Sequence, residues 1–202
     1  MTKLHYEKAQ FLLSVAHLNQ LPPDTGFEVA IVGRSNAGKS SILNQLTQNK
    51  SLARVSKTPG RTQLINLFSI DKDRRIADLP GYGYAKVPPA MKQRWQQLLD
   101  SYLRSRECLR GLILVMDIRH PLKEFDQQLL TWSDQCKLPV HILLNKSDKL
   151  TFGAIKKTLR DVNTGILAYS NPITVQTFSA LKNLGIKEFQ KTMDEWFNNP
   201  AT

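Results

Sequence analysis

Cysteine and long apolar runs are scarce in this 202-residue sequence, and each scarcity excludes a class of protein. The two cysteines, Cys108 and Cys136, are too few and too far apart for a disulfide framework or a cysteine metal site. No apolar stretch approaches the roughly 20 residues that a membrane-spanning helix needs. The apolar patch at 11–18 is broken by Ser14 and His17, and no small-residue cleavage site follows it, so we do not expect a secretory signal. We therefore expect a cytoplasmic protein that does not enter a membrane.

Acidic residues are also few, with 17 Asp and Glu against 28 Lys and Arg, which gives a formal net charge of +11. Such an excess attracts polyanions and speeds encounter with them. RNA, DNA and anionic membrane are the candidate partners on charge alone. Hydrophobic residues make up 41% of the chain and charged residues 22%, an ordinary balance for a globular domain with a buried core.

Strand-like and helix-like segments alternate along the chain, which is typical of an α/β fold with a mostly parallel sheet. Short apolar runs predict strands at residues 27–32, 64–70, 74–79, 112–116, 140–144 and 173–178. Helical spacing predicts helices at residues 39–47, 88–103, 123–137, 152–169 and 186–197. The second and third strands should form a hairpin. We expect residues 1–25 to be an N-terminal extension with a short amphipathic helix, and residues 26–198 to be one domain.

Residues 33–40, with the sequence GRSNAGKS, match the phosphate-binding P-loop pattern and lie between a predicted buried strand and a predicted helix. The glycines let successive backbone N–H groups face inward, and the helix N-terminus adds partial positive charge. Lys39 can reach the β- and γ-phosphates of a nucleotide, and the Ser40 hydroxyl can bind Mg²⁺. The pattern predicts a nucleoside triphosphate site.

Residues 145–148, with the sequence NKSD, follow another predicted buried strand and favour guanine as the base. The carboxylate of Asp148 can accept hydrogen bonds from the guanine N1–H and 2-amino groups, and adenine offers neither donor there. Asn145 can brace the loop, and the stem of Lys146 can lie along the base. The sequence FSA at 178–180 closes the next predicted strand, where backbone N–H groups can meet the guanine O6 atom.

The sequence DLPG at 78–81 ends a further predicted strand. Asp78 can hold Mg²⁺ through water, and the Gly81 N–H can contact the γ-phosphate. The polar loop at 57–63, KTPGRTQ, offers a threonine to complete the Mg²⁺ shell; we favour Thr62, with Thr58 as the alternative. Contacts that need the γ-phosphate would order such loops, and hydrolysis would release them.

Taken together, GRSNAGKS at 33–40, KTPGRTQ at 57–63, DLPGYGY at 78–84 and DIRHP at 117–121 resemble the EngB family of bacterial GTPases. The resemblance covers nearly the whole chain, although Asn145 stands where the family often has threonine. It implies a Ras-like P-loop GTPase domain with a mostly parallel six-stranded sheet, one antiparallel edge strand and helices on both faces. It also implies that Thr62 is the Mg²⁺ ligand, and that the protein acts in late assembly of the large (50S) ribosomal subunit. Family members are needed for normal cell division and septation.

The expected binding residues follow from these motifs. Nucleotide contacts are predicted for Gly33, Arg34, Ser35, Asn36, Ala37, Gly38, Lys39, Ser40, Ser41, Gly60, Arg61, Thr62, Gln63, Leu64, Asp78, Leu79, Pro80, Gly81, Asn145, Lys146, Ser147, Asp148, Phe178, Ser179 and Ala180. Within that set, Lys39, Thr62 and Gly81 are the predicted catalytic residues, and Ser40, Thr62 and Asp78 are the predicted Mg²⁺ ligands.

Tyr82 follows Gly81, where many GTPases have a glutamine that orients the attacking water. A phenol cannot perform that role from the same backbone position, so we expect slow intrinsic hydrolysis of GTP to GDP. A partner could supply the missing transition-state stabilisation. K⁺ is a second candidate activator, because Asn36 resembles the asparagine that helps to bind K⁺ in cation-activated GTPases.

Basic residues near the expected switches are candidate RNA contacts: Lys50, Arg54, Lys57, Arg61, Arg104, Arg106, Arg110, Arg119 and His120. The expected partner is the large ribosomal subunit or its precursor, bound by a monomer. The alternatives are a signalling G protein and a non-catalytic guanine-nucleotide-binding module, each with a protein effector. The charge and the lack of a lipidation motif disfavour the first, and Tyr82 motivates the second.

Overall fold

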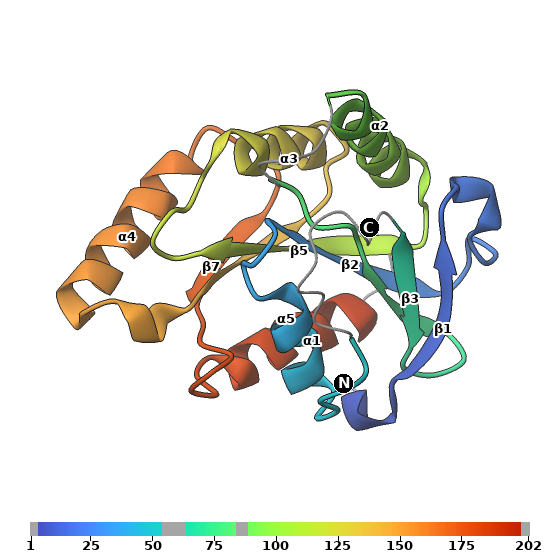
Figure 1. The fold of residues 1–202 in the computed structure, drawn as a ribbon, viewed down its shortest axis with the longest axis horizontal. Helices are drawn as coiled ribbons and strands as arrows, with labels where there is room; N and C mark the ends of the chain where they lie inside the picture. The colour runs from blue at the N-terminus through green and yellow to red at the C-terminus, as the bar shows by residue number, and fades with distance from the viewer. Residues whose placement is uncertain (1–3, 54–63, 84–88, 199–202) are drawn as a thin grey trace.

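The computed structural model describes residues 4–53, 64–83 and 89–198. Helices and strands alternate along most of the chain (Figure 1). The strands are β1 (Gln10–Val15), β2 (Phe27–Gly33), β3 (Ile65–Ser69), β4 (Arg74–Asp78), β5 (Leu109–Asp117), β6 (Val140–Asn145) and β7 (Ile173–Thr177). The α-helices are α1 (Lys39–Leu46), α2 (Pro89–Ser105), α3 (Glu124–Gln135), α4 (Phe152–Gly165) and α5 (Ile186–Asn198), and short 3-10 helices cover Tyr6–Lys8, Leu18–Gln20 and Ser147–Lys149.

All seven strands form one sheet in the order β1-β3-β4-β2-β5-β6-β7. The pairs β4-β2, β2-β5, β5-β6 and β6-β7 are parallel, whereas β3 pairs antiparallel with both β4 and β1. Among the strands of the described residues, β3 alone therefore runs against the others. The predicted mixed α/β architecture is confirmed, and so is the hairpin, in which Asp71 accepts hydrogen bonds from the N–H groups of Asp73 and Arg74.

The N-terminal segment differs from expectation. The described part of the chain contributes seven strands to the sheet rather than six, because residues 10–15 form β1 instead of the expected amphipathic helix. β1 pairs with β3 along its length, with a bulge between Phe11 and Leu13. The antiparallel strand β3 consequently lies inside the sheet, and β1 forms the edge. The periodicity of this segment was ambiguous because the bulge breaks the alternation that identifies a strand.

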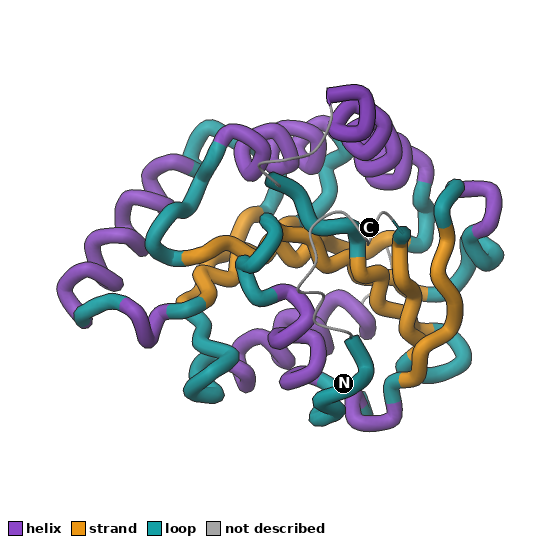
Figure 2. Tube along the Cα trace, in the orientation of Figure 1, coloured by secondary structure: helices purple, strands orange, loops and turns teal. Residues whose placement is uncertain are grey.

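Helices cover both faces of the sheet (Figures 1 and 2). α2, α3 and α4 lie on one face, where Leu99, Leu129 and Val162 join the core beneath them. α1 and α5 lie on the other face, where Leu43 and Phe189 are fully buried. Helix α4 ends at Gly165, four residues earlier than predicted. The predicted helix was too long because Ile166 continues the apolar pattern beyond the last helical turn.

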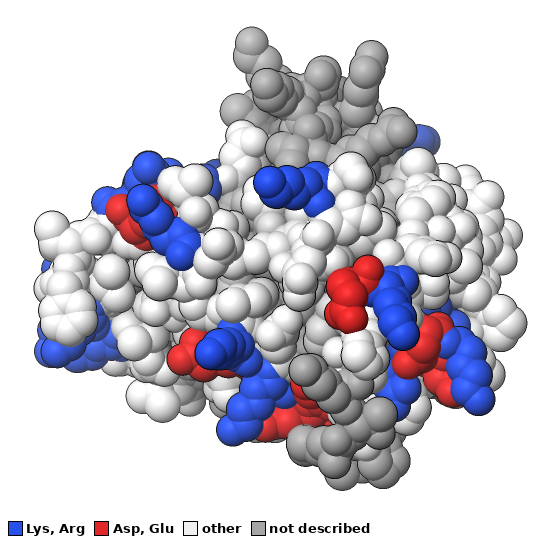
Figure 3. All heavy atoms as spheres, turned by 90° about the horizontal axis from the view of Figure 1, so that it is seen from below, with Lys and Arg blue, Asp and Glu red and all other residues white. Residues whose placement is uncertain are grey.

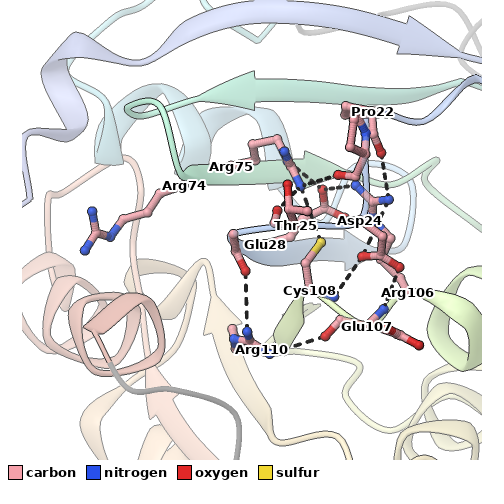
Figure 4. A network of polar contacts seen from close by, with 12 residues as sticks. Pro22, Asp24, Thr25, Glu28, Arg74, Arg75, Arg106, Glu107, Cys108 and Arg110 are labelled. Atoms are coloured by element: carbon pink, nitrogen blue, oxygen red, sulfur yellow. Dashed lines mark hydrogen bonds and ion pairs between the residues drawn. The ribbon is translucent and has the colours of Figure 1, made fainter.

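A buried polar network holds together the amino-terminal end of the sheet (Figure 4). Glu28 on β2 is fully buried and accepts hydrogen bonds from Arg75, Arg106 and Tyr102. Arg75 lies beside it in the register of β2 and β4. Burial also raises the pKa of the Cys108 thiol to about 12. This thiol is therefore not a reactive group, and the network is structural.

Among the helices of the described ranges, none has the length and apolar character to cross a membrane.

Candidate functional site

The loop at 33–40 joins β2 to α1 in a conformation that depends on its glycines. Gly38 has a φ of +100°, and a Cβ atom there would lie 2.2 Å from Nδ2 of Asn145. A Cβ at Gly33 would lie 2.5 Å from the backbone oxygen of Val115. The loop therefore closes tightly at the N-terminus of α1, where backbone N–H groups and the helix dipole favour a bound anion.

Lys39 and Asp78 meet at this loop. Lys39 is the first residue of α1, Asp78 is the last residue of β4, and the ammonium of Lys39 donates to Oδ1 of Asp78. Their side chains are only 12% and 8% exposed. A buried charge needs a partner. If the ammonium of Lys39 bound an incoming phosphate instead of Asp78, the carboxylate of Asp78 would lose its partner and could bind a cation.

The residues around this pair fit Mg²⁺ that arrives with a nucleotide. The Ser40 hydroxyl and the Asp78 carboxylate are hard oxygen donors, and Mg²⁺ is commonly bound by one or two such groups together with substrate phosphates. Among the described residues, no group of three or more His, Cys, Asp or Glu is placed to hold a metal ion. Ser40 and Asp78 are suited to a metal ion whose remaining ligands come from a nucleotide.

The segment after Gly81 is held against the P-loop. Ser35 N–H donates to the carbonyl of Tyr82 at 2.7 Å, and Tyr82 N–H donates to the carbonyl of Gly33 at 3.3 Å. A Cβ at Gly81 would lie 3.5 Å from the same Gly33 oxygen. The backbone of Gly81 is thus placed beside the phosphate loop, as its predicted contact with a γ-phosphate requires.

The side chain of Tyr82 points into the protein interior. It is 1% exposed, and its hydroxyl donates to Oδ1 of Asp126 on α3. The ring lies 5.6 Å from Trp95 and 4.6 Å from Phe125, measured between centroids. Burial raises the pKa of Asp126, and the hydrogen bond from Tyr82 opposes this rise. In this arrangement Tyr82 has no access to an attacking water.

Asn145, at the end of β6, links two parts of the expected nucleotide site. Its side chain is 2% exposed, and its Nδ2 donates to the carbonyl of Ala37 in the P-loop at 2.7 Å. Its Oδ1 accepts from the N–H of Ala180 at 3.2 Å. The structure therefore confirms the bracing geometry expected of Asn145. Because the N–H of Ala180 is already paired, a guanine O6 atom would have to share or replace this bond.

Asp148 lies beside Ser179, whose hydroxyl donates to its Oδ1 at 2.5 Å. This hydrogen bond lowers the pKa of the Asp148 carboxyl, so the group is ionised at neutral pH. Ser179 itself is fully buried, and its hydroxyl also accepts from the N–H of Lys182 at 3.1 Å. An ionised, oriented carboxylate is the acceptor that the N1–H and 2-amino groups of guanine require.

Lys146 is fixed by a carboxylate to which the sequence alone assigned no role. Its ammonium contacts Asp117 at 3.0 Å and donates to the carbonyl of Asn36 at 2.5 Å. Arg119 donates to both oxygens of Asp117, at 2.9 and 2.7 Å, and this pairing lowers the pKa of the Asp117 carboxyl. No local sequence signal identifies this contact, because it depends on the register of β5 and β6, in which Asp117 and Asn145 are direct partners.

The remaining predicted contacts differ in whether the structure describes them and in whether their side chains are exposed. Gly60, Arg61, Thr62 and Gln63 lie outside the described residues, as do Arg54, Lys57 and Thr58. The ring of Phe178 is buried against Phe189, 6.0 Å between centroids, so only its backbone faces the loop, where its carbonyl accepts from the N–H of Ser147. Leu79 and Ala37 are also buried, whereas Ser41 is exposed.

Several expected RNA contacts have structural roles instead. Arg106 is only 8% exposed and is bound to Glu28, so the expectation that it reaches RNA is wrong. Arg110 lies over the ring of Phe27 at 5.0 Å and donates to backbone carbonyls. Arg104 is paired with Asp100 on the same helix. Lys50 and His120 are exposed.

Comparison with known proteins identifies the family. The family model described as "50S ribosome-binding GTPase" matches residues 28–146. A relative from Coxiella burnetii, described as probable GTP-binding protein EngB, is 54% identical over 96% of this chain and 95% of the relative. The chain belongs to the EngB family of GTPases. Relatives with the same description from Enterobacter and from Escherichia coli O157:H7 are each 52% identical over 98% of this chain, and over 95% and 94% of their own length.

Solved structures show the same fold. A crystal structure of a probable GTP-binding protein EngB aligns with a TM-score of 0.69 at 20% identity, over 84% of this chain and 98% of that one. Aquifex aeolicus Era, solved with GDP and AlF₄⁻, aligns with a TM-score of 0.64 at 20% identity, over 88% of this chain and 58% of that one. The resemblance to EngB and the P-loop GTPase fold expected from the sequence are both confirmed.

Proposed function

We propose that this EngB-family chain binds GTP with Mg²⁺, hydrolyses it slowly to GDP, and acts as a nucleotide-controlled switch in late assembly of the large ribosomal subunit. The observation that carries the proposal is the side chain of Asn145. Through it, the phosphate loop at Ala37 and the loop at Ala180 are joined into one unit, and Asp148 stands beside that unit. Such a site would bind the base and the phosphates of a single nucleotide at the same time.

Each part of the site has a distinct role in the proposed reaction. Asp148 selects guanine, and Lys146 lies where its stem can cover the base. Lys39 binds the β- and γ-phosphates. Ser40 and Asp78 would hold Mg²⁺, with Thr62 as the proposed third protein ligand. The metal would neutralise charge that develops on the phosphates, and the Gly81 N–H would donate to the γ-phosphate.

Slow hydrolysis follows from the orientation of Tyr82. Its side chain is buried against α2 and α3, so this position cannot supply a water-orienting group. We propose that K⁺ or a ribosomal element accelerates the reaction. Asn36 is the candidate K⁺ ligand, because it is exposed and its side chain makes no hydrogen bond to another described residue. A partner that supplies transition-state stabilisation can raise such rates by about 10³–10⁵.

Two observations support the ribosomal partner. The matching family model carries the description "50S ribosome-binding GTPase", and the net charge of +11 favours an RNA-rich particle. A role on ribosomal subunits would place the protein in the cytoplasm, and a failure of subunit assembly would disturb division and septation.

The test combines turnover with binding. Phosphate release is measured at saturating GTP, with and without Mg²⁺, in K⁺ or Na⁺, and in the presence of large subunits. Co-sedimentation with large subunits is compared between a non-hydrolysable GTP analogue and GDP. The proposal predicts slow, Mg²⁺-dependent turnover that subunits or K⁺ accelerate, and binding that prefers the GTP analogue. Equal turnover in both salts, together with unchanged turnover in Asn36→Ala, would show that K⁺ does not activate the protein. Failure to bind subunits in either nucleotide state would remove the ribosomal role.

A further inference from the structure

Helix α4 has two faces with different properties. Ile155, Leu159, Val162 and Ile166 recur at helical spacing and pack against the hydrophobic core. The side of the helix that adjoins this apolar face carries Phe152, Lys156 and Arg160 at intervals of four residues, and all three side chains are exposed. Residues four apart lie on one side of a helix, so these three form a row on the solvent side. Together with the neighbouring exposed Lys157 they make up the α4 stripe.

Phe152 is unusual in this stripe because 71% of it is exposed, although it is a large aromatic residue. The ammonium of Lys156 lies 4.5 Å from the centre of its ring. With so much of the ring exposed, the lysine cannot cover both faces. A flat aromatic surface next to a cation is therefore available to a ligand.

The stripe is also electrostatically uncompensated. Within the described part of the chain, no carboxylate forms an ion pair with Lys156, Lys157 or Arg160, whereas Arg104 and Arg119 each pair with an aspartate. Figure 3 shows basic side chains at the left edge of the molecule, the side on which α4 lies in Figure 1. The sole acidic residue of α4 is Asp161. The face of α4 therefore has positive charge available for an anionic partner.

The position of the stripe connects it with the nucleotide site. Thr151 caps α4 by accepting from the N–H of Ala154, and Phe152 is the first residue of the helix. Asp148, the proposed guanine acceptor, lies only four residues earlier, in a 3-10 helix that ends at Lys149. A ligand on Phe152 would thus contact a segment continuous with the guanine loop.

We propose that the α4 stripe, formed by Phe152, Lys156, Lys157 and Arg160, binds unpaired nucleotides of RNA. One base stacks on the ring of Phe152, and the three basic side chains contact the adjoining phosphates. Every base has an aromatic face, and positive grooves that carry aromatic residues are a common way to bind single strands. Duplex RNA does not present its bases in this way. The inference rests on the proposed function in that it names the RNA contact of a ribosome-binding protein.

The test measures binding of the full-length chain to a fluorescently labelled 12-nucleotide single-stranded RNA by anisotropy, with the matched duplex and polyglutamate as competitors. Phe152→Ala should weaken binding by about 5- to 100-fold, the range for loss of one stacked base. Phe152→Tyr should bind like the wild type, and Phe152→Leu should bind like Phe152→Ala because leucine cannot stack. Lys157→Gln with Arg160→Gln should weaken binding and flatten its dependence on salt.

The control is Lys187→Gln with Lys191→Gln, which removes the same charge from exposed positions on α5. It should weaken binding less than the α4 pair. Unchanged affinity in Phe152→Ala, equal binding of duplex, or retention of binding in Phe152→Leu would overturn the inference. So would displacement of the RNA by polyglutamate, because that result would indicate a generic anion site or a site for an acidic protein.

Two further measurements separate this inference from the proposed function. All Phe152 variants should keep the GDP affinity of the wild type, which shows that they are folded. If wild-type chain co-sediments with large subunits and Phe152→Ala does so equally well, the α4 inference is wrong and the ribosomal role stands. If wild type does not bind subunits, the ribosomal role is wrong, and the oligonucleotide measurement still decides the chemistry of the stripe.

Discussion

Replacing Tyr82 by phenylalanine should destabilise the fold through one hydrogen bond. The hydroxyl donates to Oδ1 of Asp126, whose other oxygen accepts from the N–H of Lys123 at 2.8 Å. Tyr82→Phe keeps the ring between Trp95 and Phe125 and removes only this donor. A hydrogen bond to a charged group contributes about 1.5–3 kcal/mol. For a chain of this size, 1 kcal/mol shifts Tm by about 2–4 °C, so the expected fall in Tm is about 3–12 °C.

The loss should also depend on pH in a defined direction. Burial raises the pKa of Asp126, and Tyr82 lowers it, so removing the hydroxyl raises that pKa further. A carboxyl with a raised folded pKa favours the folded state at low pH, and this advantage is lost as pH rises above its ordinary value of about 3.9. The difference in Tm between wild type and Tyr82→Phe should therefore be larger at pH 7 than at pH 4.

Differential scanning calorimetry at several pH values tests both expectations. The control is Tyr169→Phe, which removes a single weak hydrogen bond of 3.4 Å to the carbonyl of Gln127. It should lower Tm by less than 2 °C, a rough bound for one poor surface contact. A difference for Tyr82→Phe no larger than that of the control, or one that increases on acidification, would refute this account of Tyr82.

Three other substitutions test separate parts of the structure. Tyr82→Gln should not accelerate GTP hydrolysis, because the position faces α2 and α3, and a gain in phosphate release would contradict that orientation. Glu28→Gln should lower the free energy of unfolding by about 3–5 kcal/mol in urea titrations, since it removes the buried counter-charge of Arg75 and leaves Arg106 with only Asp24, at 3.7 Å. It should leave GDP affinity unchanged. Asn145→Ala should raise the dissociation constant for GDP by about 30- to 150-fold in isothermal titration calorimetry, equivalent to about 2–3 kcal/mol for losing its two bonds.

The parallel part of the sheet could be predicted from sequence because its strands are short, continuous apolar runs. Residues 27–32 and 140–144, for example, are buried on both sides of the sheet and read as strands without ambiguity. β1 could not be predicted in the same way. It is an edge strand with a bulge, and four of its six residues are exposed. Its pairing with β3 is a long-range contact that no local pattern specifies.

The residues of the candidate site divide in the same way: some are set by a local sequence motif, and others depend on contacts between residues far apart in the sequence. Loop residues such as Gly38, Lys39 and Asp148 were predictable because each motif fixes a residue type at a defined spacing. The role of Asp117 was not, because it depends on the register that places β5 beside β6. The mistaken role for Arg106 has the same origin. A basic residue after a helix reads as exposed until its partner Glu28, 78 residues away in sequence, is known.

The central claim, that Asp148 selects guanine, is tested most directly by Asp148→Asn and a change of base. Xanthine carries an oxygen where guanine carries its 2-amino group, so it needs a donor where guanine needs an acceptor. Asparagine provides that donor. Dissociation constants for GDP and xanthosine diphosphate are measured for both proteins by isothermal titration calorimetry. The account predicts that wild type prefers GDP, and that Asp148→Asn loses GDP affinity by at least about 100-fold while gaining affinity for xanthosine diphosphate. Unchanged GDP affinity in Asp148→Asn, with no gain for xanthosine diphosphate, would contradict it.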